Sequence, residues 1–467
     1  MAIEQKLIKY LKVSNSMITL DAFSVFLIGI YTYVFFSKKN ICSKYLKVLS
    51  ISLTVYLIVD VSMFASIAGL KIRAIEFTYY MTFIISFYRL HLDKIFRKYK
   101  NVFLILIFLI IINNVMIIVC PTKIPSVTLP NLWFDFFNNG QQYFPSINKY
   151  VLVYDIYILM TTTIIIGLVE YLNKKTLNYL QVYISDLIYV MLFVVLLEIL
   201  VKNIFGVENY YSTRNLIFGL NVDSVGEIVR GQAVKHFGLM SEPAALAFSI
   251  FVMNSTTNLI VRDKKELIIK NSIFLFLGLC TGSLLFVVYF AICILQLVVE
   301  HLSGLKKLVN KYKKTIWLVI VITTIASGLL IYRSNLFDYF YERINNIIVL
   351  IRGGTLSYSS ELVRISTSIN MLEVFISKPL FGAGIATVYG FSAIATMLSN
   401  FGILLTVAFL LVFNLFLQLN KSNITSRTMF YIIIYIFVLL IQGTLNSILF
   451  LTILPLLFNI KTSKEGN

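Results

Sequence analysis

Long apolar runs alternate with short polar stretches along almost the whole chain. A helix needs about 20 apolar residues to cross a hydrocarbon core of about 30 Å. Runs of that length predict membrane-spanning helices at 17–37, 46–70, 101–120, 150–172, 180–201, 236–260, 315–333 and 394–419. Shorter or more crowded candidates lie at 74–90, 266–282, 283–299 and 428–460. The pattern therefore predicts an all-α, polytopic membrane protein with about twelve transmembrane helices.

Two long polar stretches interrupt this pattern, at residues 202–235 and 333–393. Within the second stretch, Ile365, Ile369, Leu372 and Phe375 recur at helical spacing. This spacing predicts an amphipathic lid helix, which should end before Pro379 because the residue preceding a proline disfavours helical geometry. No other domain boundary is visible, so the sequence indicates a single integral membrane domain over residues 1–467.

Composition and charge distribution refine this picture. With 58% hydrophobic residues, 13% charged residues and a mean hydropathy of +0.86, the chain is not an ordinary soluble domain. The net charge of +18 does not indicate nucleic-acid binding, because alternate short loops hold 21 Lys and Arg while the loops between them hold four. This is the positive-inside pattern, which predicts that the lysine-rich loops are cytoplasmic. Both long polar stretches then become extracytoplasmic loops.

The sequence predicts neither a metal site nor a bound cofactor. The four cysteines lie in or beside apolar segments without a close pair, which is typical of small buried hydrophobic residues. The three histidines are far apart and lack acidic or cysteine neighbours at ligand spacing. No phosphate-binding glycine loop is present, so the chain is not predicted to hydrolyse ATP.

The first segment with possible chemistry runs from Arg230 and Gly231 through Lys235, His236 and Gly238 to Ser241-Glu242-Pro243. Pro243 suits the first turn of a helix, Ser241 suits its cap and Glu242 suits the positive end of its dipole, so backbone geometry alone explains this tripeptide. A functional interpretation rests on the whole group. Arg230 and Lys235 can neutralise a diphosphate, while Glu242 or His236 can take a proton from a sugar hydroxyl.

The second segment runs from Ser359 through Glu361 and Arg364 to Pro379-Leu380-Phe381-Gly382-Ala383-Gly384. The two long loops together carry six of the eleven arginines. Arginine at a membrane surface is suited to bidentate recognition of phosphate. On the predicted lid the arginines of the second loop would face the phosphate-rich surface, and these are Arg333, Arg343, Arg352 and Arg364. A purely structural lid is the alternative interpretation.

At these two segments the chain resembles the Wzy-type polymerases of bacterial O-antigen, capsule and exopolysaccharide synthesis, and the related O-antigen ligases. The resemblance rests on Arg230-Gly231 to Glu242-Pro243 and on Arg364 to Pro379-Leu380-Phe381-Gly382-Ala383-Gly384. It implies a GT-C-type membrane glycosyltransferase in a bacterial cytoplasmic membrane. Membrane lipids would surround the enzyme, and a flippase and a chain-length regulator are the protein partners that the resemblance implies.

The resemblance also implies a reaction. A hydroxyl of one undecaprenyl-pyrophosphate-linked glycan would attack the anomeric carbon of another, and undecaprenyl pyrophosphate would leave without the help of a metal ion. The residues that the resemblance assigns to binding the pyrophosphate and glycan are Arg230 and Arg364, supported by Arg214, Lys235 and Arg352. Glu242 or His236 would be the catalytic base.

Two alternative functions remain open at this point. An O-antigen ligase would transfer the finished glycan to a different acceptor, and no motif distinguishes the two acceptors. A flippase or other secondary transporter would be indicated by acidic residues inside spans. Asp60 lies well inside a predicted span and Asp186 lies partly inside one, whereas Asp155, Glu170 and Glu198 lie nearer the helix ends, where solvation is easy.

Overall fold

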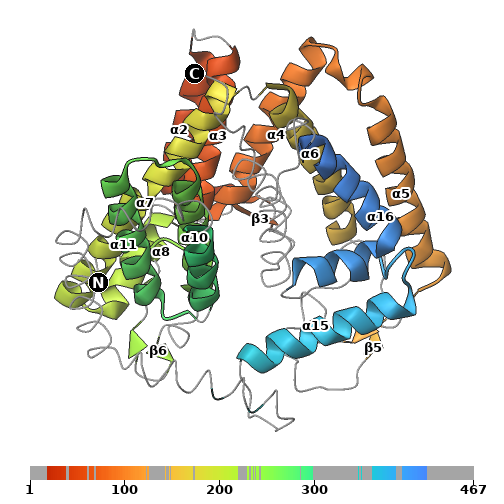
Figure 1. Cartoon of the computed structure of the whole chain (residues 1–467). Helices are drawn as coiled ribbons and strands as arrows, with labels where there is room; N and C mark the ends of the chain where they lie inside the picture. The colour runs from red at the N-terminus through yellow and green to blue at the C-terminus, as the bar shows by residue number, and fades with distance from the viewer. Residues whose placement is uncertain are drawn as a thin grey trace. The chain divides into compact units, whose positions relative to one another are not determined.

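The computed structural model describes a set of segments distributed over most of the chain (Figure 1). They are residues 18–20, 22–37, 41–59, 63–67, 70–121, 124–125, 142–143, 147, 149–171, 174–218, 229–230, 233–234, 236, 238–240, 243–283, 285–297, 345, 349, 360–384 and 392–417. The predicted spans at 315–333 and 428–460 lie outside these residues, as do Asp60, Lys235, Glu242 and Arg352.

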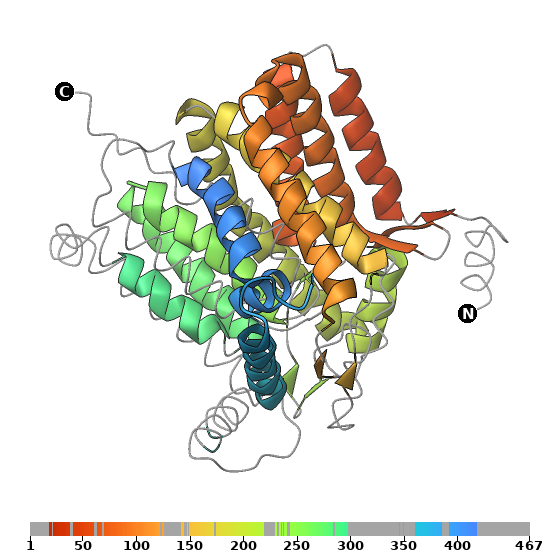
Figure 2. The ribbon, with the colours of Figure 1, turned by 90° about the vertical axis from the view of Figure 1, so that its right-hand side faces the viewer.

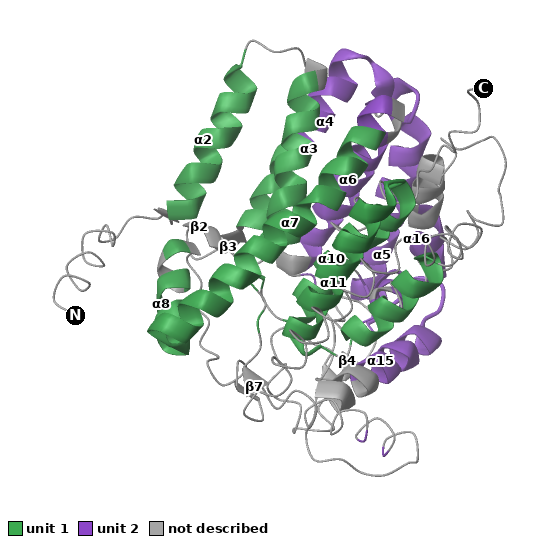
Figure 3. Cartoon of the chain, turned by 60° about the vertical axis from the view of Figure 1, so that its left-hand side comes forward, with its two compact units in different colours: residues 1–82, 178–343 green, residues 83–177, 344–467 purple. Residues whose placement is uncertain are grey.

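The sequence showed no internal boundary, but the structure divides into two compact units (Figure 3). Unit 1 comprises residues 1–82 and 178–343, and unit 2 comprises residues 83–177 and 344–467. Each unit therefore combines two segments that are distant in sequence. Helices α4 (Ala74–Leu92) and α7 (Lys174–Phe205) contribute residues to both units.

Unit 1 is a helical assembly with short strands at its edges. Its helices are α2 (Ala22–Phe36), α3 (Ile41–Ile58), most of α7, α8 (Val207–Phe218), α10 (Pro243–Ile260), α11 (Lys264–Thr281) and a helix over Leu285–Leu297. An antiparallel sheet in the order β1-β2-β3 joins Ile18–Leu20, Met63–Ile67 and Leu70–Arg73, and β6 (Val229–Arg230) pairs with β7 (Ala233–Val234). These strands qualify the all-α expectation, because 63–67 had been predicted as part of a span.

Helix α10 forms the centre of unit 1 and is buried on all sides along most of its length. Its second half is polar, with a continuous run from Asn254 to Asn258. Gln296 donates to the carbonyl of Ser255 at 2.8 Å, and Thr257 lies 2.8 Å from the hydroxyl of Ser185. Hydrogen bonds of this kind between helices allow polar side chains to be buried where no water can solvate them. They bind α10 to α7 and to the helix Leu285–Leu297.

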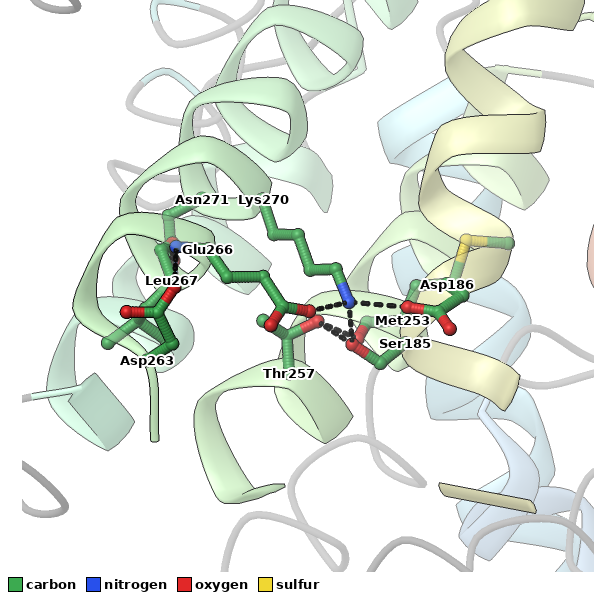
Figure 4. A network of polar contacts seen from close by, with 9 residues as sticks. All are labelled: Ser185, Asp186, Met253, Thr257, Asp263, Glu266, Leu267, Lys270 and Asn271. Atoms are coloured by element: carbon green, nitrogen blue, oxygen red, sulfur yellow. Dashed lines mark hydrogen bonds and ion pairs between the residues drawn. The ribbon is translucent and has the colours of Figure 1, made fainter. Parts of the chain in front are cut away.

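An ionic network connects α7 to α11 in the same unit (Figure 4). Lys270 of α11 is buried, and its Nζ lies 2.7 Å from both Asp186 Oδ1 and Glu266 Oε1. The same ammonium donates to the hydroxyl of Ser185 at 2.9 Å. Asp186, which the transporter alternative relied on, is therefore engaged in holding two helices together.

Unit 2 contains the remaining described helices, which are the end of α4, the short 3-10 helix η1 (Ile95–Arg97), α5 (Lys100–Val119), α6 (Lys149–Tyr171), α15 (Ser360–Ser377) and α16 (Ala393–Leu417). Strands β4 (Ile124–Pro125) and β5 (Gln142–Tyr143) form a two-stranded pair. The α4–α5 connection is bound to the end of α6, because Lys98 and Tyr99 both donate to Glu170 Oε1. Helix α16 packs against α5, α6 and α15.

Helix α16 is broken at Gly402, where φ is +63° and ψ is −173°. Figure 1 shows the two parts as blue segments that meet at an angle, and Figure 2 shows α15 beside the first of them. The sequence predicted one continuous span over 394–419. Its apolar character concealed the break, because a hydropathy pattern does not report the backbone conformation of a single glycine.

Several sequence predictions agree with the structure. Four described helices are long and apolar enough to cross a membrane, at Lys100–Val119, Val151–Leu168, Lys175–Phe205 and Pro243–Ile260. Shorter apolar helices occupy Ala22–Phe36, Leu285–Leu297 and Ile394–Ala408. The chain is thus a helical membrane protein, as its apolar runs indicated. The helix predicted within residues 333–393 is present as α15, and α10 begins at Pro243 as expected.

Candidate functional site

A cluster of charged and phenolic side chains binds the loop that precedes α10. We call these residues the anchor cluster: Glu198 and Lys202 of α7, and Tyr210, Tyr211 and Arg214 of α8. Glu198 Oε1 forms an ion pair of 2.6 Å with Lys202 Nζ, one helical turn away, and both side chains are almost completely buried. The other carboxylate oxygen accepts the backbone N–H of Gly238 at 2.6 Å. Glu198 thus connects α7 directly to loop 236–240.

Helix α8 supplies the remaining contacts of the cluster with this loop. The hydroxyl of Tyr210 donates to the carbonyl of Gly238 at 3.1 Å, and Arg214 Nη2 donates to the carbonyl of Met240 at 2.6 Å. Lys202 Nζ donates to the Tyr211 hydroxyl at 2.8 Å. Burial raises the pKa of both tyrosines well above the ordinary value, so both phenols remain protonated. The cluster thus combines two basic side chains, Lys202 and Arg214, with one carboxylate.

Gly238 has a backbone conformation that suits this arrangement. Its φ is +60°, in the left-handed region that favours glycine, and a Cβ at this position would lie 3.1 Å from Val194 Cγ1. A side chain would therefore be strained and would press against α7. The glycine allows the loop to approach α7 closely enough for the Gly238 N–H to reach Glu198.

His236, one of the two candidate bases, lies at the start of this loop. Its backbone N–H donates to the carbonyl of Cys280 at 3.1 Å, which binds the loop to the end of α11. Burial, with a smaller contribution from Lys202, lowers the pKa of the imidazole to about 3. The ring is therefore neutral at physiological pH. Its Nδ1 is buried and makes no hydrogen bond within the described part of the chain.

The structure brings together some of the predicted site residues. Arg214 and His236 meet at loop 236–240, and Arg230 lies in β6 of the same unit. Arg364 lies in α15 of unit 2. The side chains of Arg230 and Arg364 lie outside the described set, and the catalytic and substrate-binding roles of all these residues stay predictions.

Two corrections concern α7. Lys202 had been placed at the start of the extracytoplasmic loop 202–235, but α7 continues to Phe205 and Lys202 is buried in it. Glu198 had been interpreted as easily solvated near a helix end, but it is 1% exposed. The two errors share a cause, because a carboxylate and an ammonium one turn apart neutralise each other and can be buried together. Their spacing of four residues was the sequence clue.

The second sequence motif forms a structural element in unit 2. We call residues Pro379–Gly384 the strap, because they run along the break in α16 and bind both sides of it. The carbonyls of Ser399 and Asn400, on one side of the break, accept the N–H groups of Ala383 and Gly384 at 2.7 and 3.1 Å. On the other side, the N–H groups of Ile403 and Leu404 donate to the carbonyls of Pro379 and Leu380 at 2.8 and 3.2 Å. The strap satisfies backbone groups that a broken helix would otherwise leave unpaired.

Helix α5 supports the strap from the membrane-spanning part of unit 2. Asn113 is buried, and its Nδ2 donates to the carbonyls of Phe381 at 2.6 Å and Asn400 at 3.3 Å. Gly382 has a φ of +69°, and a Cβ there would lie 2.6 Å from the backbone of Asn400. The presence of glycine at position 382 therefore has a structural reason that is independent of any substrate.

Comparisons with models of known protein families and with curated proteins gave no match to this chain.

Proposed function

We propose that this chain is a multi-pass glycosyltransferase of a bacterial cytoplasmic membrane that joins undecaprenyl-pyrophosphate-linked oligosaccharide repeat units into a polysaccharide. The observation that carries this proposal is the attachment of loop 236–240 to α7 and α8 by the buried residues Glu198, Lys202 and Arg214. This loop leads directly into Ser241-Glu242-Pro243. A transferase needs such a fixed loop, because its reacting groups must be held in a productive geometry.

In this mechanism a hydroxyl oxygen of one repeat unit forms a bond to the anomeric carbon of the glycan on a second lipid. The bond from that carbon to the pyrophosphate oxygen breaks, and undecaprenyl pyrophosphate leaves with the electron pair. Glu242 or His236 accepts the hydroxyl proton. Arginine stabilises the charge on the leaving group, with Arg230 and Arg364 as first choices.

His236 is the less favoured of the two bases. A pKa of about 3 makes its imidazole a weak proton acceptor, because an effective base has a pKa near the working pH. Glu242 is the preferred base for this reason. The proton from the acceptor hydroxyl would then pass to a carboxylate at the start of α10.

The alternatives are affected differently by the structure. An O-antigen ligase would use the same loops and the same leaving group, so it remains the second candidate in the same class. The transporter alternative loses part of its support, since Asp186 is paired with Lys270 (Figure 4). Intramembrane acids indicate a transport path mainly when they face one, and Asp186 holds α7 to α11.

Gene deletion followed by glycan sizing tests the proposal. Loss of long chains with retained single repeat units is the expected result. Lipid-linked polymer that never reaches its acceptor would instead indicate the ligase, and precursors trapped inside the cell would indicate the flippase.

Complementation of the deletion strain tests the assigned arginines. Arg230→Ala and Arg364→Ala should each abolish polymer while single units persist, because the leaving group loses its counter-charge. Arg262→Ala is the matched control, since Arg262 is exposed in the α10–α11 connection at the opposite end of α10 from loop 236–240. Wild-type ladders from both loop variants, at normal membrane levels, would remove the pyrophosphate assignment.

A further inference from the structure

We infer that Glu198, with Lys202 as its counter-ion, is a positioning residue of the transferase: it holds loop 236–240 from inside the membrane-spanning helix α7. This inference rests on the proposed function and adds a residue to it. Both carboxylate oxygens of Glu198 are used, one by the Gly238 N–H and the other by Lys202 Nζ. A buried carboxylate is costly unless it is paired and hydrogen-bonded, and Glu198 meets both conditions.

The loop is held at three alternate residues, each by a different helix. His236 is bound through its N–H to α11, Gly238 through its N–H to α7, and Met240 through its carbonyl to Arg214 of α8. The carbonyl of Gly238 is bound as well, by Tyr210. Glu198 is the central contact of this set. Its charge-assisted bond to Gly238 is of the stronger kind of hydrogen bond, so its loss should release the middle of the loop.

The position of loop 236–240 should affect catalysis through the residues that follow the loop. Met240 is followed directly by Ser241 and Glu242, so a shift of loop 236–240 moves the start of the segment that carries the candidate base. A misplacement of about 1 Å costs about 100-fold in rate. Since Glu198 is buried beneath the loop, substrate binding should depend on it little. The loss should therefore appear in kcat, with KM for the repeat unit nearly unchanged.

General destabilisation of α7 is the competing explanation, and Asp186 on the same helix is a partial control, since its side chain is exposed whereas that of Glu198 is buried. Asp186 also lies on α7 and pairs with a lysine, Lys270, but it contacts α11 and not the loop. An Asp186 variant shows how the loss of an ion pair on α7 affects the rate when the loop is not contacted, and Lys270 keeps its second partner, Glu266, in that variant. If Glu198 positions the loop, only its variant should slow the transfer.

The experiment compares three variants in the deletion strain and in membranes prepared from it. Glu198→Leu should lower kcat about 100-fold at an unchanged amount of membrane-inserted protein, whereas Asp186→Asn should retain the wild-type rate. The double variant Glu198→Gln/Lys202→Met keeps an oxygen to accept the Gly238 N–H and removes both charges together. It should recover most of the rate, even if Glu198→Leu alone proves too unstable to measure.

A loop-specific measurement separates this inference from the proposed function. Leu239→Cys, in a Cys42→Ser/Cys120→Ser background, should react faster with a maleimide when Glu198 is Leu than when Glu198 is intact or when Asp186 is Asn. Equal labelling rates in the three proteins, or a double variant as slow as Glu198→Leu, would overturn the positioning role. An unchanged glycan after gene deletion would remove the polymerase function instead, while the labelling result would still decide the role of Glu198.

Discussion

Three glycines with different surroundings allow a graded test of the close contact between the strap and the break in α16. Gly382 combines a φ of +69° with a Cβ site 2.6 Å from the Asn400 backbone. Gly206 has a φ of +85° but open space around its Cβ site, and Gly29 lies in helix α2 with nothing within 4 Å. Alanine in place of Gly382 therefore adds both backbone strain and steric overlap, and alanine in place of Gly206 adds backbone strain alone. Alanine in place of Gly29 adds neither.

The expected free energies follow from these geometries. Gly29→Ala should stabilise the protein by about 0.5–1 kcal/mol, because alanine loses less backbone entropy in a helix. Gly206→Ala should destabilise it by about 1–2 kcal/mol, the cost of left-handed backbone for a residue with a Cβ. Gly382→Ala adds an overpacking cost of about 1–3 kcal/mol, since the atoms in its way belong to the backbone and not to a flexible side chain. Its total should be about 2–5 kcal/mol.

Thermal unfolding of the purified protein in detergent measures this order. The midpoints should rank Gly29→Ala above wild type, wild type above Gly206→Ala, and Gly382→Ala lowest. Gly402→Ala should fall with Gly382→Ala, because its φ of +63° and ψ of −173° belong to a region that only glycine occupies readily. If Gly382→Ala unfolded with the same midpoint as Gly206→Ala, the close backbone contact between the strap and the break would not exist as described.

Two further predictions concern individual side chains. Because the folded-state pKa of His236 is about 3 and its ordinary value is 6.5, the unfolded chain binds more protons between these values, so stability should fall as pH drops from 6.5 towards 3. His236→Gln should flatten that part of a stability-versus-pH curve. Asn113→Leu should destabilise the protein by about 1–3 kcal/mol, because it removes the donor to two carbonyls at the break in α16. An Asn113→Leu protein that unfolds at the wild-type midpoint would contradict this support from α5.

Much of the helical framework could be predicted because membrane spans follow a simple rule of length and polarity. Helix α5 is an example, because it is long and apolar enough to cross a membrane. The start of α10 at Pro243 and the turn at Gly282, where φ is +56°, were also predictable from local geometry. Each of these features depends on residues that are adjacent in sequence.

Helix α15 shows where local periodicity is insufficient. Ile369 and Leu372, whose spacing predicted this helix, are exposed, whereas Met371 and Val374 are buried. The periodicity correctly indicated a helix but did not identify its buried face, because α15 carries apolar residues on two opposite sides. Choosing between those sides requires knowledge of α16, which follows later in the chain.

The anchor cluster depends on the same kind of distant information. Glu198 and Lys202 resemble loop residues when their charges are considered alone. Their burial becomes favourable only because each charge neutralises the other and because the Gly238 N–H, 40 residues from Glu198, completes the set. Loop 236–240 and α7 thus stabilise each other. The Glu198–Lys202 pair binds the loop, and the Gly238 N–H helps to keep the Glu198 carboxylate buried in a membrane helix. A substitution in α7 should therefore alter loop 236–240, and a substitution in the loop should alter α7.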